Sequence, residues 1–127
     1  MPYQATQFMA EQGLEGNIFN DYGDGAFLIY YLFPKIRPVM DSRIDVYGSE
    51  LAREYFASRE NPVKFFQYLT KYNVSYILLR KSQKNGQILD FLVYLPATEL
   101  LLETEDRLLF SYDPKRLPPN LMPPKAP

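Results

Sequence analysis

The stretch from Asn61 to Arg80 constrains the fold most strongly, because it joins a clear helix start to a clear strand. Asn61 followed by Pro62 is typical of a helix start, with the Asn side chain capping the first turn. An apolar stripe at helical spacing follows: Phe65, Phe66, Leu69 and Tyr72. Asn73 suits the left-handed residue that ends a helix. The nearly continuous apolar run "VSYILLR" (74–80) then predicts a central strand covered on both faces, and therefore an α/β fold.

The rest of the chain alternates helical and strand-like segments. Apolar periodicity and turn residues predict helices over 2–12, 25–33, 50–59 and 87–95, and strands over 17–20, 37–43, 98–104 and 107–112. Asp24 and Ser49 are expected to cap the helices that follow them. The prediction is a three-layer α/β domain whose mainly parallel sheet has the 74–80 strand at or near its centre. Strands 17–20 and 37–43 are expected to flank it, with an antiparallel hairpin (98–112) at one edge.

The C-terminal segment has a different composition. Residues 113–127, "DPKRLPPNLMPPKAP", carry six of the 11 prolines, which predicts an extended tail or linker after a single domain over 1–112. No secretory signal opens the chain. The longest apolar run, 26–33, is far shorter than the roughly 20 residues of a membrane span. We therefore expect the chain as given to be soluble.

Composition excludes several kinds of chemistry. The chain has no His and no Cys, so a Ser-His-Asp triad, a Cys-His pair, a His-ligated metal and a disulfide cannot form. With 14 basic and 15 acidic residues and no basic patch or tail, nucleic acid is not an expected partner. The stretch "NDYGDG" (20–25) lacks the closing Glu of a calcium loop and the Lys-Ser/Thr of a phosphate loop. We interpret it as a turn before a helix, and expect no cofactor or metal.

The stretch "RPVMDSRIDVYGSE" (37–50) holds the main candidate site. In an extended strand Asp41, Arg43 and Asp45 point to the same side. They follow a predicted parallel strand, and the carboxyl ends of such strands are where open α/β sheets bind ligands. One interpretation is a polar ligand site completed by the rings of Tyr22 and Tyr47. The other is a structural brace, in which Arg43 holds the carboxylates. We favour the brace, because Arg between two carboxylates suits a salt bridge better than acid–base catalysis.

Three motifs in order resemble one family. "NIFNDYGDGAFLIYYLFP" is similar to the pattern Phe-Asn-x-Tyr-x-Trp-Gly-Gly-Tyr-Leu followed by Pro, and "VMDSRIDVYG" to Asp-x-Arg-x-Asp-x-Tyr-Gly. "YNVSYILL" resembles the strand Tyr-Gly-Val-Asp-Tyr-Val-Leu that follows. The matching residues are Phe19, Asn20, Tyr22, Gly25, Leu28, Pro34, Asp41, Arg43, Asp45, Tyr47 and Gly48. The chain departs from the pattern at Asp24, Ala26, Phe27 and Ser42. Asp24 stands where the pattern has Trp, a possible sugar-stacking ring.

These motifs resemble the soluble extracytoplasmic domain of polytopic bacterial membrane proteins similar to glycosyltransferases of the dolichyl-phosphate-mannose mannosyltransferase type. The resemblance covers roughly residues 3–112. It implies a periplasmic or cell-surface location, attachment to a transmembrane portion, and contact with a glycan or lipid-linked sugar. It also implies that the catalytic carboxylates belong to the membrane portion, so the domain alone is not expected to catalyse a reaction. The alternatives are a free-standing glycan- or protein-binding domain and a small carboxylate-dependent enzyme.

Overall fold

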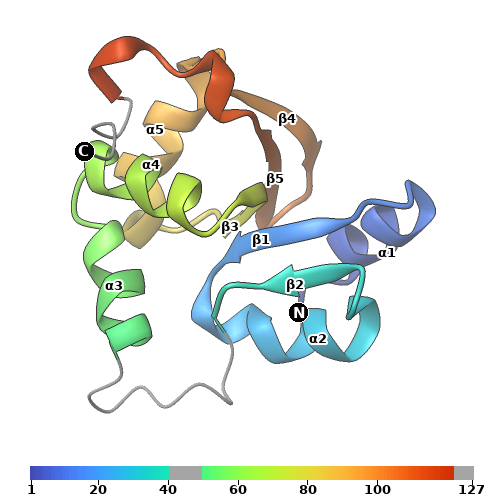
Figure 1. The fold of residues 1–127 in the computed structure, drawn as a ribbon. Coiled ribbons are helices and arrows are strands. Elements are labelled where there is room, and N and C mark those ends of the chain that lie inside the picture. Colours follow the sequence, from blue (N-terminus) through green and yellow to red (C-terminus); the bar gives the residue numbers. More distant parts are fainter. Residues whose placement is uncertain (41–49, 122–127) are drawn as a thin grey trace.

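The structure is a computed structural model that describes residues 1–40 and 50–121 (Figure 1). Its helices and strands are, in chain order, α1 (Tyr3–Glu11), β1 (Gly16–Asn20), α2 (Gly25–Leu32), β2 (Ile36–Pro38), α3 (Glu50–Ser58), α4 (Pro62–Lys71), β3 (Val74–Arg80), α5 (Gly86–Tyr94), β4 (Thr98–Glu103) and β5 (Arg107–Tyr112). The described helices include none long and apolar enough to cross a membrane.

The five strands form one sheet in the order β2-β1-β3-β5-β4. β1 pairs in parallel with β2 and β3, while β5 pairs antiparallel with β3 and β4. Four strands therefore run the same way and β5 runs against them, which confirms a mainly parallel sheet with an antiparallel hairpin at one edge. β3 is central, as predicted. The prediction of its neighbours was wrong in one respect: β2 pairs with β1 at the edge, and the second neighbour of β3 is β5.

Side chains that alternate along the strands fill two cores. On one face Ile18, Leu78 and Leu109 pack with residues of α1 and α2. On the other face Phe19, Ile77 and other large side chains pack with α3, α4 and α5. Helices therefore cover both faces of the sheet, as Figure 1 shows, and the three-layer prediction is confirmed.

The local signals around α4 behave as predicted. The Asn61 Oδ1 atom accepts a hydrogen bond of 2.9 Å from the backbone N–H of Lys64, so Asn61 caps the helix. Asn73 has a φ of 52°, the left-handed conformation expected after the helix end. The predicted strand 37–43 is represented by β2, which ends at Pro38. Residues 41–43 and the predicted cap Ser49 lie outside the described residues.

The C-terminal segment packs on the core as far as the structure describes it. Short 3₁₀ turns cover Pro114–Arg116 and Pro119–Leu121. Between them Leu117 is 5% exposed within the core on the α4 side of the sheet, and Leu121 packs against the same core. The sequence prediction of a tail from Asp113 onward does not anticipate this contact, because single leucines between prolines carry no periodic signal.

Candidate functional site

The carboxyl ends of β1 and β3 form the point where the chain leaves the sheet toward opposite faces. After β1 the turn 21–24 leads into α2, which packs on one face, and after β3 the loop 81–85 leads into α5, which packs on the other. Open α/β sheets bind ligands at such switch points. A cleft of about 400 Å³ opens here. Its lining residues are Asp21, Tyr22, Gly23, Tyr55, Phe56, Arg59, Arg80, Ser82 and Lys84.

Asp24, the last residue of this turn, is fully buried. Its Oδ2 accepts a hydrogen bond of 2.9 Å from Nε of Arg107, and its Oδ1 accepts 2.9 Å and 3.1 Å bonds from the Nη2 atoms of Arg107 and Arg80. The prediction that Asp24 caps α2 was wrong in this respect, because its side chain makes no capping hydrogen bond. The carboxylate instead neutralises Arg107, which β5 carries into the interior.

Arg107 is the reason that a carboxylate is needed there. Its side chain is only 4% exposed and shares a strand face with Leu109, which is buried in the α1–α2 core. A buried guanidinium without a partner costs several kcal/mol, so the fork-shaped pairing with Asp24 is a structural requirement. The hydrogen bond to Asp24 raises the pKa of Arg107 above its ordinary value. Arg107 also donates to the exposed Asp106 at 2.6 Å.

Asp21 joins three elements at the rim of the cleft. Its Oδ1 accepts a 2.9 Å hydrogen bond from Nη2 of Arg59, which follows α3. Its Oδ2 accepts a 2.8 Å bond from the backbone N–H of Arg80, the last residue of β3. Nδ2 of the buried Asn85 donates to both oxygens at 3.3 Å and 3.2 Å. Asp21 therefore holds the ends of α3 and β3 and the loop before α5 to the turn after β1.

Tyr55 extends this network below Asp21. Its hydroxyl donates a 2.6 Å hydrogen bond to the carbonyl of Asn20 and accepts a 2.7 Å bond from Nη1 of Arg59. Burial raises the pKa of Tyr55 to about 12, so the hydroxyl stays a donor at neutral pH. The ring stacks on Phe19, with 5.2 Å between centroids. Arg59 is thus fixed by both a carboxylate and a phenol.

The open part of the cleft presents cations and rings. The Arg80 side chain is 48% exposed although it also reaches Asp24. Lys84 is exposed and forms no hydrogen bond or ion pair with the residues in 1–40 or 50–121. Tyr22 and the 45% exposed Phe56 add ring faces. Cations bind phosphate or carboxylate groups, and rings pack against apolar sugar faces. The Asp21 and Asp24 oxygens, in contrast, already accept hydrogen bonds from other side chains of the protein.

Gly23 keeps the Arg80 side chain close to the turn. A Cβ atom at Gly23 would lie 3.2 Å from Nη2 of Arg80, tighter than an ordinary contact. A side chain at this position would therefore push the guanidinium outward. Within the described ranges, no three His, Cys, Asp or Glu side chains group closely enough to hold a metal ion.

Only one residue of the sequence-predicted site can be placed. Tyr22 lines the cleft. Asp41, Arg43, Asp45 and Tyr47 lie outside the described residues, so their proposed cluster and the Arg43 brace stay predictions. The sequence reasoning missed the residues that form the described network: Asp21, Arg59, Arg80, Asn85 and Arg107. Arg107 carried a usable signal, since a charge on the same strand face as buried leucines requires a buried partner.

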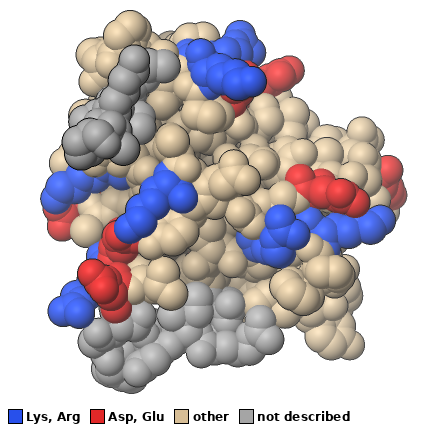
Figure 2. All heavy atoms as spheres, in the orientation of Figure 1, with Lys and Arg blue, Asp and Glu red and all other residues tan. Residues whose placement is uncertain are grey.

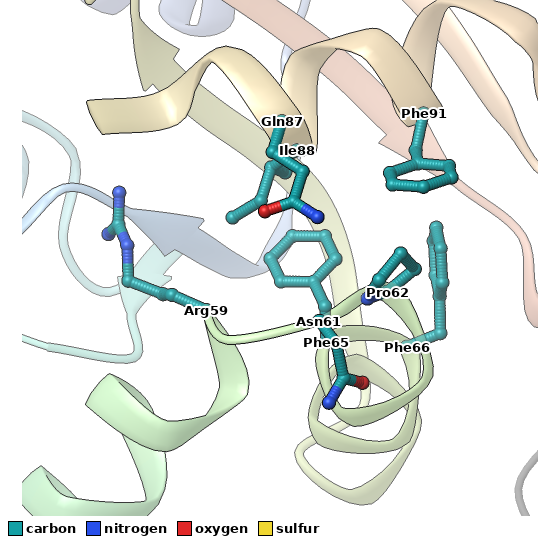
Figure 3. Close-up of a pocket in the computed structure, with 8 residues that line it drawn as sticks. All are labelled: Arg59, Asn61, Pro62, Phe65, Phe66, Gln87, Ile88 and Phe91. Carbon is teal, nitrogen blue, oxygen red and sulfur yellow. The ribbon is translucent and has the colours of Figure 1, made fainter. Parts of the chain in front are cut away.

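A second pocket lies between α4 and α5 and is shown in Figure 3. It is lined by Arg59, Asn61, Pro62, Phe65, Phe66, Gln87, Ile88 and Phe91. Its rings point toward one another across the gap, and Arg59 stands to one side (Figure 3). A volume of about 10 Å³ admits roughly one water-sized sphere. We interpret this pocket as a packing gap and the cleft at β1 and β3 as the candidate site.

No protein-family model matches this chain, and no curated protein matches it. Among solved structures, the chain is similar to the C-terminal globular domain of an oligosaccharyltransferase from Archaeoglobus fulgidus. The TM-score is 0.62 at 11% sequence identity, covering 87% of this chain and 95% of that domain. At this identity the likeness concerns the fold. The likeness shows that the two domains share a fold.

Proposed function

We propose that this chain is a non-catalytic extracytoplasmic domain of a membrane glycosyltransferase-like protein of the dolichyl-phosphate-mannose mannosyltransferase type. The observation that carries the proposal is the fold likeness over nearly the whole of both domains. The three motifs that resemble such proteins support it independently, since they rest on the sequence alone. In this function the domain supports the membrane-embedded catalytic part or positions the acceptor, and the transmembrane portion of the same protein is its partner.

The cleft at β1 and β3 is the surface that we assign to a glycan or lipid-linked sugar. Arg80 and Lys84 supply positive charge for a phosphate, and the rings of Tyr22 and Phe56 supply stacking surfaces. Carboxylate catalysis is disfavoured at this place. The Asp21 and Asp24 oxygens already accept hydrogen bonds from arginine and asparagine groups, so neither carboxylate is free to take a proton from a bound hydroxyl.

Cell fractionation tests the membrane assignment. An antibody against the 14.9 kDa chain is used on membrane and soluble fractions of the cells that make it. We expect a much larger polypeptide that stays with carbonate-washed membranes and is cut by protease added outside spheroplasts. A 14.9 kDa species in the soluble fraction would contradict this function and favour a free-standing binding domain.

Nuclear magnetic resonance of the ¹⁵N-labelled chain tests the ligand assignment separately. Mannose 1-phosphate and methyl mannoside are titrated as probes of the sugar and its phosphate. We expect the sugar phosphate to shift the backbone resonances of Gly23, Ser82 and Lys84, which line the cleft. Shifts confined to residues far from the cleft, or no saturable shift with either probe, would remove the ligand role from this surface.

A further inference from the structure

The outer face of α2 consists of uncharged and mostly aromatic side chains. Phe27, Tyr30 and Tyr31 lie at i, i+3 and i+4, so they share one face of the helix. Tyr30 is 80% exposed and Tyr31 is 55% exposed. The opposite face carries Leu28 and Leu32, which are buried against the sheet. Both faces of α2 are therefore apolar, although a helix that covers a sheet ordinarily has a polar outer face.

Four rings, among them the half-buried Phe27, form a chain of contacts on this side of the molecule. Ring centroids are 4.9 Å apart between Tyr3 and Phe27, 4.5 Å between Phe27 and Tyr31, and 4.8 Å between Tyr30 and Tyr31. Phe33, which is 55% exposed, follows the helix directly. We call Tyr3, Phe27, Tyr30, Tyr31 and Phe33 the α2 aromatic face. Contiguous exposed patches of this kind mark interaction surfaces.

The other sheet-covering helices show that this face is unusual within the molecule. Charged side chains are exposed on α3 at Glu50, on α4 at Lys64 and on α5 at Asp90. By contrast, α2 contains no charged residue between Gly25 and Leu32. Exposed apolar side chains such as Leu51 and Tyr94 also occur on α3 and α5, but these helices carry exposed charges as well, whereas the exposed rings of α2 have no charged neighbour on their own helix.

The charges on α2 and on the segment that follows it have one sign. Residues 25–40 contain no Asp or Glu, and their charged residues are Lys35 and Arg37, both exposed. Figure 2 shows uncharged side chains over α2 with basic side chains bordering them near β2. Tyrosine is enriched at membrane–water interfaces because its ring is apolar and its hydroxyl is wet, and adjacent cations attract anionic headgroups.

We propose that the α2 aromatic face binds the surface of a lipid bilayer that carries anionic headgroups. The rings enter the headgroup–acyl boundary and Lys35 and Arg37 lie among the headgroups. This inference goes beyond the proposed function, since the chain by itself would bind vesicles whether or not it belongs to a glycosyltransferase.

A tryptophan reporter tests the proposal on the whole chain, which contains no Trp of its own. Tyr31→Trp places the fluorophore in the α2 aromatic face. Tyr94→Trp is the matched control, because Tyr94 is 84% exposed on α5. With vesicles of phosphatidylcholine and phosphatidylglycerol we expect a blue shift of emission for Tyr31→Trp and none for Tyr94→Trp. With phosphatidylcholine alone the shift should require more lipid.

Vesicle co-sedimentation supplies the second measurement. The double variant Tyr30→Ser and Tyr31→Ser should bind about tenfold more weakly or worse, because two rings leave the interface. Lys35→Gln should lower binding several-fold on anionic vesicles only. Thermal melts confirm that each variant is folded.

Three results would overturn the proposal. They are an unshifted emission of Tyr31→Trp on both vesicles, an equal shift of Tyr94→Trp, and unchanged sedimentation of the serine variant. A concentration-dependent dimer that the serine variant abolishes, without vesicle binding, would assign the face to a second copy of the chain instead.

Discussion

The turn 21–24 contains two carboxylates, Asp21 and Asp24, which differ in burial and in the partners that hold them. Asp24 is fully buried and is held by Arg107, whose side chain is 4% exposed. Asp21 is 13% exposed at the rim of the cleft and is held by Arg59, Asn85 and a backbone N–H. The first carboxylate neutralises a charge in the core, and the second joins element ends beside an open surface. One short turn thus separates a structural ion pair from a candidate binding surface.

This contrast indicates where substitutions should affect stability and where they should affect ligands. Removing one member of a buried pair leaves an uncompensated charge in a low-dielectric interior, whereas water partly replaces a partner at the rim. Arg80 belongs both to the buried ion-pair network and to the cleft surface, since its side chain contacts Asp24 and is still 48% exposed. The variants below test this division from the largest expected effect to the smallest.

Asp24→Asn should have the largest effect on stability. The change removes the buried carboxylate that pairs with Arg107 and leaves only the exposed Asp106 as its partner. Breaking a buried pair costs about 3–5 kcal/mol. Urea unfolding followed by circular dichroism should show a much lower midpoint with an unchanged slope. The control is Asp106→Asn, because Asp106 also pairs with Arg107 but its side chain is 63% exposed. That variant should lose about 1 kcal/mol or less. Equal losses for both variants would contradict the distinction between core and rim.

Asp21→Asn should have a smaller but clear effect. The amide keeps the shape of the side chain but removes the charge opposite Arg59. Its NH₂ group only donates, so the one amide oxygen must replace two accepting carboxylate oxygens. Hydrogen bonds to charged groups contribute about 1.5–3 kcal/mol, so the loss should lie in this range. Urea unfolding of both variants in the same buffer compares the loss of unfolding free energy with that of Asp24→Asn. A loss that exceeds that of Asp24→Asn would reverse the proposed roles of the two carboxylates.

Arg80→Ala should affect ligands more than stability. Arg107 still neutralises Asp24, and the exposed part of Arg80 is screened by solvent, so the stability loss should be about 1 kcal/mol or less. Binding of mannose 1-phosphate to the cleft should fall by about tenfold, since a phosphate partner is removed. Arg80→Lys keeps a positive charge and serves as the control, with partial retention of binding. Unchanged binding by Arg80→Ala would exclude Arg80 from the ligand surface.

Much of the fold could be predicted from local patterns, including the central position of β3, but the full strand order could not. Asn61 and Asn73 mark the ends of α4 through local effects, a side-chain cap and a left-handed backbone conformation. The apolar composition of the run 74–80 is enough to predict a strand covered on both faces. The second strand that pairs with β3 could not be predicted in this way. β5 pairs with β3 through contacts such as Ile77 with Phe110, and no local pattern in either strand specifies this pairing. Which strand pairs with β3 on this side depends on how the whole β4–β5 hairpin packs against the sheet.

One residue of the predicted site can be placed at the described cleft. Tyr22 follows β1 and lines this cleft, and its role in binding a ligand stays a prediction. Asp24 was interpreted as a helix cap because Asp before an apolar helix is a common cap, yet its partner Arg107 is 83 residues away. Pairing at that distance is set by the position of β5 in the sheet. Burial of Arg107 beside Leu109 on one strand face is the pattern that could have predicted it.

Glu54→Gln should have the smallest effect, and the effect should depend on pH. Glu54 lies on α3 beside the end of α4 and accepts hydrogen bonds from Lys71 and from the hydroxyl of Tyr72. These bonds lower the pKa of Glu54 below its ordinary value. A carboxyl whose folded pKa is depressed stabilises the fold above its unfolded pKa near 4.5, and this contribution is lost as the pH falls through the folded pKa. The midpoint difference between wild type and Glu54→Gln should therefore be present at pH 7, shrink below pH 4.5, and decrease in high salt. Urea midpoints measured across pH and salt check this. A difference that persists at low pH and high salt would show that Glu54 stabilises the protein through packing. The expectation that more exposed ion pairs contribute less to stability would then not hold for Glu54.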